Sequence, residues 1–206
     1  MTVEAVAALA GCAAGTGSQP SVQGGTVAGA DPYYVVDVNN ALVNVPSALL
    51  VLERRTSNTH EQRIVLPNPT TLRGDNEIRV RAHGSRQTTL KRFSFEGVKR
   101  DFGGWPHPFG DLTAGGLVSS SDALGSFAYA QRNYGTNTTC VLVLRRVGAE
   151  ARTMASGAKA LDVVMRHCTL GTLEDALAPM GGSTLGYEAT STGQIYSLSP
   201  HAAPGG

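Results

Sequence analysis

The chain has 206 residues, of which 41% are hydrophobic and 16% are charged, and its formal net charge is +1 at pH 7. This apolar content is too high for an intrinsically disordered chain, and the near-neutral charge provides no basic field that would hold nucleic acid. The sequence has no run of apolar residues long enough for a transmembrane helix, so none is predicted.

The N-terminal segment ends in the tetrapeptide LAGC, at residues 9–12. This tetrapeptide resembles the lipobox of bacterial lipoproteins, in which small residues precede a cysteine that is acylated through its sulfur. Residues 1–12 contain Glu4 and no basic residue, so we interpret them as a truncated signal segment with Cys12 as the lipidation site. The alternative is an Ala-rich first helix that ends at Gly11.

The composition changes sharply after the cysteine. Residues 13–31 are rich in Gly, Ser, Gln and small apolar residues, which predicts a flexible linker. Sequence typical of strands begins immediately afterwards, so residues 32–199 are predicted to form a single domain. Residues 200–206, PHAAPGG, are predicted to be a loose tail.

Several stretches in the first half of the domain are rich in β-branched or aromatic residues or alternate between apolar and charged side chains. They predict strands at residues 33–38, 61–67, 77–83 and 88–97, and residues 48–55 suit either a strand or a short helix. In residues 77–83 the alternation is regular, which predicts one apolar and one charged face. We expect residues 61–97 to form an antiparallel meander.

The second half begins with a loop rich in Gly, Pro and aromatic residues at 102–116. A helix is expected near 123–135, buried strands at 140–147 and 160–168, a short helix at 172–180 and a final hairpin at 186–199. Thr172 and Asp175 fit a capping box at the start of the short helix. Strands with a few short helices and no regular β–α alternation predict an α+β fold with a mainly antiparallel sheet.

Two cysteines remain besides Cys12. Cys140 begins one predicted strand and Cys168 ends another, so antiparallel pairing of the two strands would bring the thiols together. The alternative is two buried free thiols, which are common in cytosolic proteins. Export to an oxidising compartment favours the disulfide, and we predict that Cys140 and Cys168 are bridged. No spacing of Cys and His residues predicts a metal site, and no cofactor is expected.

The loop at 102–116 contains the best candidates for ligand contacts. Trp105, Phe102 and Phe109 are candidate glycan contacts, because flat aromatic faces stack on the apolar faces of sugar rings. The alternative is that the single Trp fills the core beneath the loop. The motifs of a nucleophile elbow and of a phosphate-binding loop are both absent, so no catalytic residue is assigned and we do not expect an enzyme.

A group of basic residues follows the predicted strands. These residues could face an acidic partner or lipid headgroups, or they could be the solvated face of a half-exposed sheet. The group comprises Arg79, Arg81, Arg86, Lys91, Arg92, Lys99 and Arg100.

Three stretches of the domain resemble the cellulose biosynthesis protein BcsN family. The resemblance covers residues 46–186 and follows the pattern and order of residues rather than a catalytic signature. It rests on Glu61-Gln62 before a strand, on Gly74 and Asn76 before the next, and on a Cys that closes a strand ahead of a short helix with Leu173 and Leu177.

The resemblance implies a small exported protein that helps to make, export or organise extracellular cellulose. We therefore expect a non-catalytic lipoprotein that acts as an accessory or scaffold factor in cellulose or exopolysaccharide biosynthesis. Its expected partners are membrane lipid, through the acyl anchor, and proteins of the export machine. Ala13, rather than Asp, follows Cys12, which favours the periplasmic face of the outer membrane. The alternatives are an assembly lipoprotein of a pilus or secretion machine and a periplasmic glycan-binding protein.

Overall fold

The computed structural model describes residues 32–56, 59–84, 90, 92–154 and 157–186. The chain divides into two units, Met1–Ala30 and Asp31–Gly206, and all the described residues belong to the second. The predictions for Cys12, the linker at 13–31, the hairpin at 186–199 and the tail concern parts of the chain that lie almost wholly outside these residues.

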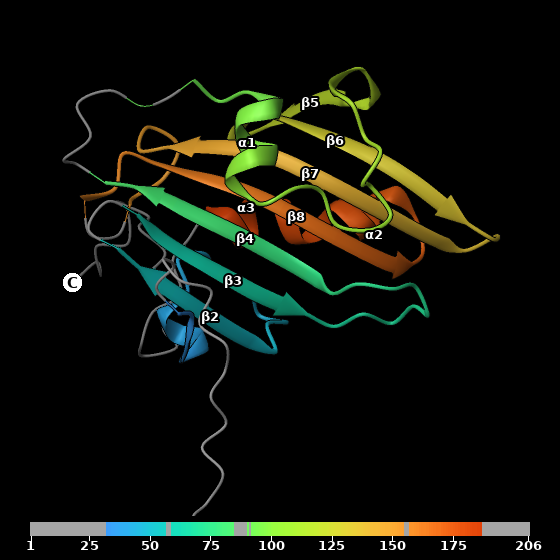
Figure 1. Ribbon diagram of the computed structural model, residues 1–206, viewed down its shortest axis with the longest axis horizontal. Helices are drawn as coiled ribbons and strands as arrows, with labels where there is room; N and C mark the ends of the chain where they lie inside the picture. Colours follow the sequence, from blue (N-terminus) through green and yellow to red (C-terminus); the bar gives the residue numbers. More distant parts are fainter. Residues whose placement is uncertain (1–31, 57–58, 85–89, 91, 155–156, 187–206) are drawn as a thin grey trace, which may run out of the picture. The chain divides into compact units, whose positions relative to one another are not determined.

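One eight-stranded sheet forms the centre of the fold, and its strands follow the order β1-β2-β3-β4-β8-β7-β6-β5. Every pair of neighbouring strands is antiparallel, as Figure 1 shows. The predicted α+β class with a mainly antiparallel sheet is therefore confirmed. The strands are β1 (Tyr34–Val36), β2 (Leu50–Arg55), β3 (His60–Leu66), β4 (Asn76–His83), β5 (Val118–Asp122), β6 (Gly125–Tyr134), β7 (Thr138–Gly148) and β8 (Ala160–Leu170).

The two longest strands, β7 and β8, lie in the middle of the sheet and pair along their whole length. Both are apolar on both faces over most of their length, as expected of strands covered on each side. β8 also pairs with β4, which lies far away in sequence. Two blocks that are local in sequence, β1–β4 and β5–β8, are joined in this way into one sheet.

Each face of the sheet is covered by different elements. Behind the sheet in Figure 1 lie α2 (Leu173–Leu177) and α3 (Gly182–Leu185), and in front of it lies α1 (Phe95–Asp101). The larger apolar core packs beneath α2, α3 and the segment 41–45. The smaller core packs beneath α1 and the loop that follows it, and it includes both half-cystines. Short 3-10 turns lie at Val38–Asn40, Ala114–Gly116 and Ala178–Met180.

The predicted capping box of the short helix is confirmed. The Thr172 hydroxyl accepts from the Asp175 amide at 3.2 Å, and the Asp175 carboxylate accepts from the Thr172 amide at 2.8 Å. These contacts satisfy backbone groups that the first turn of a helix leaves without partners. The α-helix ends at Leu177, and Pro179 lies in the 3-10 turn that follows.

Two predicted elements are wrong. Residues 123–135 were expected to contain a helix but form β6, because their side chains alternate between the two sheet faces and β7 offers a complete edge for pairing. The predicted strand at 88–97 is replaced at its end by α1, whose first turn is capped by Ser94. Of the meander predicted at 61–97, β3 and β4 are therefore present; β1 and β2 precede them in the same antiparallel series, which ends at His83.

Candidate functional site

A row of alternating charges crosses the face of the sheet that α1 covers. Arg54 on β2 lies directly opposite Glu61 on β3, and Glu61 lies opposite Arg81 on β4. The row continues through Asp162 on β8 to Arg146 on β7. Opposite charges on adjacent strands attract each other. The ion pairs between these side chains therefore stabilise a part of the sheet that has charged rather than apolar side chains.

Glu61 is the centre of the row. Its carboxylate accepts from Arg81 Nε at 2.6 Å and from Arg54 Nε at 3.2 Å, and it also accepts from the Tyr33 hydroxyl at 3.1 Å. Burial alone would raise the pKa of Glu61, but the two arginines outweigh it and hold the pKa below its usual value. Glu61 therefore holds two cations and a phenol in fixed positions.

A second carboxylate, that of Glu77, also binds two arginines, and these lie on β3 and β4 next to the first row of charges. Arg63 and Arg79 lie directly opposite each other on β3 and β4, an arrangement that would be repulsive on its own. The buried Glu77 carboxylate accepts from Arg63 Nη2 at 2.7 Å and from Arg79 Nε at 2.6 Å. Glu77 thus joins two like charges into one ion-pair cluster.

These rows form the floor of a cavity of about 340 Å³, which we call the arginine cavity. Its wall includes the C-terminal end of α1 and the start of the following loop. Aromatic rings support two of the guanidinium groups, with Arg54 lying 4.6 Å from the centroid of Tyr33 and Arg81 lying 5.3 Å from that of Phe102. The charged lining residues are Arg54, Glu61, Arg63, Arg79, Arg81, Arg100 and Asp101.

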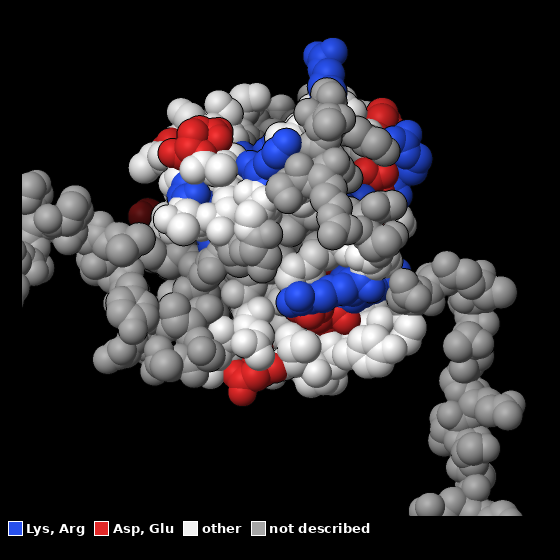
Figure 2. Space-filling model, turned by 90° about the vertical axis from the view of Figure 1, so that its left-hand side faces the viewer, with Lys and Arg blue, Asp and Glu red and all other residues white. Residues whose placement is uncertain are grey.

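The basic residues singled out in the sequence are therefore not one solvated surface. Arg79 and Arg81 take part in the ion-pair rows, and Lys99 and Arg100 lie on α1. Arg92 is exposed, whereas Arg86 and Lys91 fall outside the described residues. On the face drawn in Figure 2, blue basic and red acidic side chains lie next to each other.

Sequence reasoning missed Arg54, Arg63 and the carboxylates that join the arginines. The alternation in EIRVR, residues 77–81, signalled a charged face. Only the register of β2, β3 and β4 shows that each charge lies opposite a particular partner.

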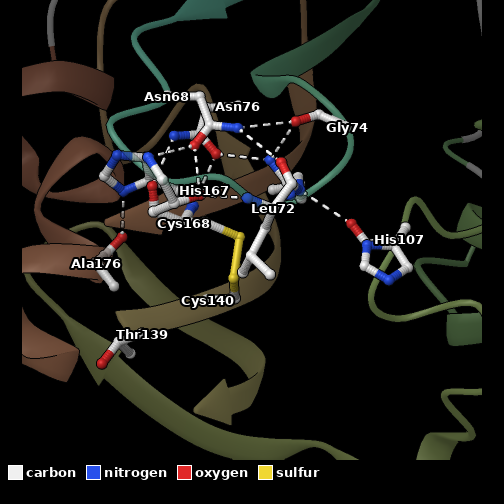
Figure 3. The surroundings of a disulfide bond; sticks show 12 residues. Asn68, Leu72, Gly74, Asn76, His107, Thr139, Cys140, His167, Cys168 and Ala176 are labelled. Carbon is white, nitrogen blue, oxygen red and sulfur yellow. Dashed lines mark hydrogen bonds between the residues drawn. A yellow bond between two sulfur atoms is a disulfide. The ribbon is translucent and has the colours of Figure 1, made fainter. Parts of the chain in front are cut away.

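The predicted disulfide is confirmed. Cys140 on β7 lies directly opposite Cys168 on β8 with a Cα–Cα distance of 4.0 Å, and the two sulfurs are bonded. Figure 3 shows Asn76 beside the bridge. The Asn76 side chain donates to Cys168 O at 2.8 Å and accepts from Cys168 N at 2.7 Å. Asn76 also donates to Pro67 O and accepts from Arg166 Nη1, so this buried amide has a partner for each of its four hydrogen-bonding positions.

Two of the three aromatic residues of the loop are buried and present no face for sugar stacking. Phe109 is fully buried and Trp105 is nearly so, packed against Phe95 with ring centroids 5.1 Å apart. Phe102 is half-buried and lies against Arg81. The prediction of glycan contacts is therefore corrected for Trp105 and Phe109, whose rings are buried, and it stays a prediction for Phe102, which lines the arginine cavity. The apolar core of the domain needs these rings, and they fill the space beneath α1 and the loop.

A third carboxylate cluster lies on the opposite face of the sheet. Glu53 accepts from Gln62 Nε2 at 2.7 Å and from Arg55 Nε at 2.5 Å, and it is hydrogen-bonded to His60 at 2.8 Å. Burial would raise the pKa of Glu53, but these contacts outweigh it and lower the pKa to about 2.

The low pKa of Glu53 predicts a loss of stability in acid. Its folded-state value is about 2 and its ordinary value is 4.5, so the unfolded chain binds the proton more readily in this interval. We expect the free energy of unfolding of the wild type to exceed that of Glu53→Gln by a constant amount above pH 4.5. The difference should shrink as the pH falls from 4.5 towards 2, and urea denaturation at a series of pH values would measure it. Glu96→Gln removes an exposed carboxylate on α1 and is the control; a Glu53→Gln difference independent of pH would contradict the prediction.

Within the described part of the chain, no group of three or more His, Cys, Asp or Glu side chains is placed to hold a metal ion. No helix in that part is long and apolar enough to cross a membrane.

The chain was compared with known protein families, with curated proteins and with solved structures, and none of them matches it.

Proposed function

We propose that the chain is a non-catalytic accessory protein of the bacterial cell envelope that serves cellulose or exopolysaccharide export. The observation that carries this proposal is the buried disulfide between the two central strands. Structural disulfides persist in oxidising compartments such as the periplasm and are rare in the cytosol. The bridge is therefore what an exported domain would contain.

The assignment to cellulose export is supported by the residues that carry the resemblance to the BcsN family. The Asn76 side chain forms hydrogen bonds with the backbone N and O of Cys168 (Figure 3). The carbonyl oxygen of Gly74 accepts from the side chains of Asn68 and Arg166. Glu61 and Gln62 likewise form contacts within the fold, since Gln62 accepts from the Leu42 amide at 2.6 Å. The matched positions thus maintain the architecture, which suits a scaffold role.

The proposal includes anchoring to the periplasmic face of the outer membrane through an acylated Cys12. Acyl chains stabilise membrane binding by about 0.8 kcal/mol for each buried CH₂ group, and two or more chains give stable attachment. The segment at 13–31 would then separate the anchor from the sheet domain. The expected partners are proteins of the export machine.

The test is Cys12→Ser in the native host. We expect the variant to lose palmitate incorporation, to leave the outer-membrane fraction and to reduce cellulose output, because the domain is no longer held beside the export machine. Metabolic labelling, fractionation and a cellulose-binding dye measure the three effects. Ser18→Ala, in the same N-terminal segment, is the matched control.

Two results would contradict the proposal. A Cys12→Ser variant that fractionates with the outer membrane as wild type does would show that Cys12 carries no anchor. Normal cellulose output in a strain that lacks the whole chain would exclude the role in cellulose export, and a defect in pili or secretion in that strain would favour the assembly-lipoprotein alternative.

A further inference from the structure

The arginine cavity has more positive than negative charge. Five arginines line it, and they meet the carboxylates of Glu61 and Asp101 in the lining and that of Glu77 beside it. Among the described residues, five positive charges therefore face three negative charges. Glu61 and Glu77 are each shared between two arginines, so neither can neutralise both of its partners.

The spare hydrogen-bond donors belong to Arg63 and Arg100. Arg63 uses Nε and Nη2 on Glu77, and Nη1 has no partner among the described residues. Among the residues that the structure describes, the charged partner of Arg100 is Asp101, whose carboxylate lies 3.7 Å from Arg100 Nε, and the Arg100 side chain is 74% exposed. A guanidinium group has five N–H donors, so both side chains keep donors that an entering group could use.

The remaining arginines are held in place before any ligand arrives. Arg79 donates to Glu77 and to Phe102 O, while Arg81 donates to Glu61 and to Asp101 O. The ring of Phe102 also packs against Arg81. Side chains that are already ordered lose little conformational entropy on binding, so the cavity is prepared for a ligand.

We propose that the arginine cavity binds a phosphate monoester or inorganic phosphate. Such a group carries close to two negative charges at neutral pH and three acceptor oxygens, which match the excess charge and the spare donors. Planar guanidinium groups recognise phosphate oxygens in pairs. The cavity volume, about 340 Å³, leaves room for the group that bears the phosphate. This proposal stands whether or not Cys12 is acylated.

Calorimetric titration of the full 206-residue chain tests the proposal. Inorganic phosphate is titrated in one arm, and phosphatidylcholine vesicles with and without phosphatidic acid in another. We expect saturable binding in at least one arm. Binding of inorganic phosphate alone would indicate a soluble ligand, and added binding to phosphatidic acid vesicles would indicate a lipid headgroup.

The variants are Arg63→Gln and Arg100→Gln, each expected to weaken binding about tenfold or more, since each removes a charge-assisted hydrogen bond. Arg132→Gln is the matched control, because Arg132 is 40% exposed and also lies 3.7 Å from a single carboxylate, that of Asp111. Arg100 is so exposed that its variant should fold even if Arg63→Gln does not. Absence of saturable binding in both arms, or equal weakening by Arg132→Gln, would overturn the proposal.

Discussion

Replacing Arg166 with Met is expected to lower the free energy of unfolding by about 3–5 kcal/mol, because several buried hydrogen bonds from a charged donor are lost and each contributes roughly 1.5–3 kcal/mol before the structure relaxes. The Arg166 side chain is almost completely buried on β8. It donates to the carbonyl oxygens of His107 at 3.0 Å, Gly74 at 2.9 Å and Arg73 at 2.9 Å, and to the Asn76 side chain at 2.8 Å. Met fills a similar volume but removes one charged donor from each of these four acceptors, of which Gly74 O and the Asn76 side chain keep a second donor.

This guanidinium group joins three segments that are distant in sequence. The turn before β4, the loop after α1 and strand β8 all meet at Arg166. Urea denaturation of the variant would measure the loss. Arg166→Lys should recover only part of the stability, since an ammonium group has three donors and lacks the planar fork. Arg132→Met, at a half-buried position on β6, is the control. A change of Arg166→Met as small as that of the control would contradict this role.

Replacing Cys140 and Cys168 together with Ala is expected to cost about 3–4 kcal/mol of unfolding free energy, since the bridge closes a loop of roughly 29 residues in the unfolded chain. Both half-cystines are fully buried in the core beneath α1. Reduction of the wild type should produce a loss of similar size, because the same constraint on the unfolded chain is removed.

The measurement is urea denaturation of the double variant and of the wild type with and without a reductant. Cys12→Ala removes a cysteine outside the bridge and should leave the denaturation midpoint unchanged. Equal midpoints for the wild type and the double variant would show that the bridge does not contribute to stability.

The sequence determined those elements whose signals are local. Strands with regular alternation, such as β4, and the strongly apolar β7 and β8 were predicted close to their observed positions. The capping box at Thr172 could also be predicted, because Thr172 and its partner Asp175 lie within four residues of each other. The cysteine pair could be predicted because each thiol lies near the end of a predicted strand, and antiparallel pairing of neighbouring strands is common in such folds.

The elements that were wrong depend on partners distant in sequence. The sequence of residues 125–134 has no strong preference for helix or strand. These residues form a strand because they pair with the edge of β7. The alternation in 88–97 predicts a strand, but packing of Val98 and Phe95 against the sheet favours a helix after Ser94. The same packing buries Trp105 and Phe109, which the sequence alone left open to a role in sugar binding.

The arginine cavity depends on both the local sequence and the tertiary structure. The sequence by itself determined that β3 and β4 have charged side chains at alternate positions. The tertiary structure decided which charges meet, because a shift of one residue in the register of neighbouring strands would turn each side chain to the other face. With the observed register, Glu61 lies between Arg54 and Arg81, and Glu77 contacts both Arg63 and Arg79. Charge pairing in a sheet thus depends on contacts between strands, and these form only when the strands come together.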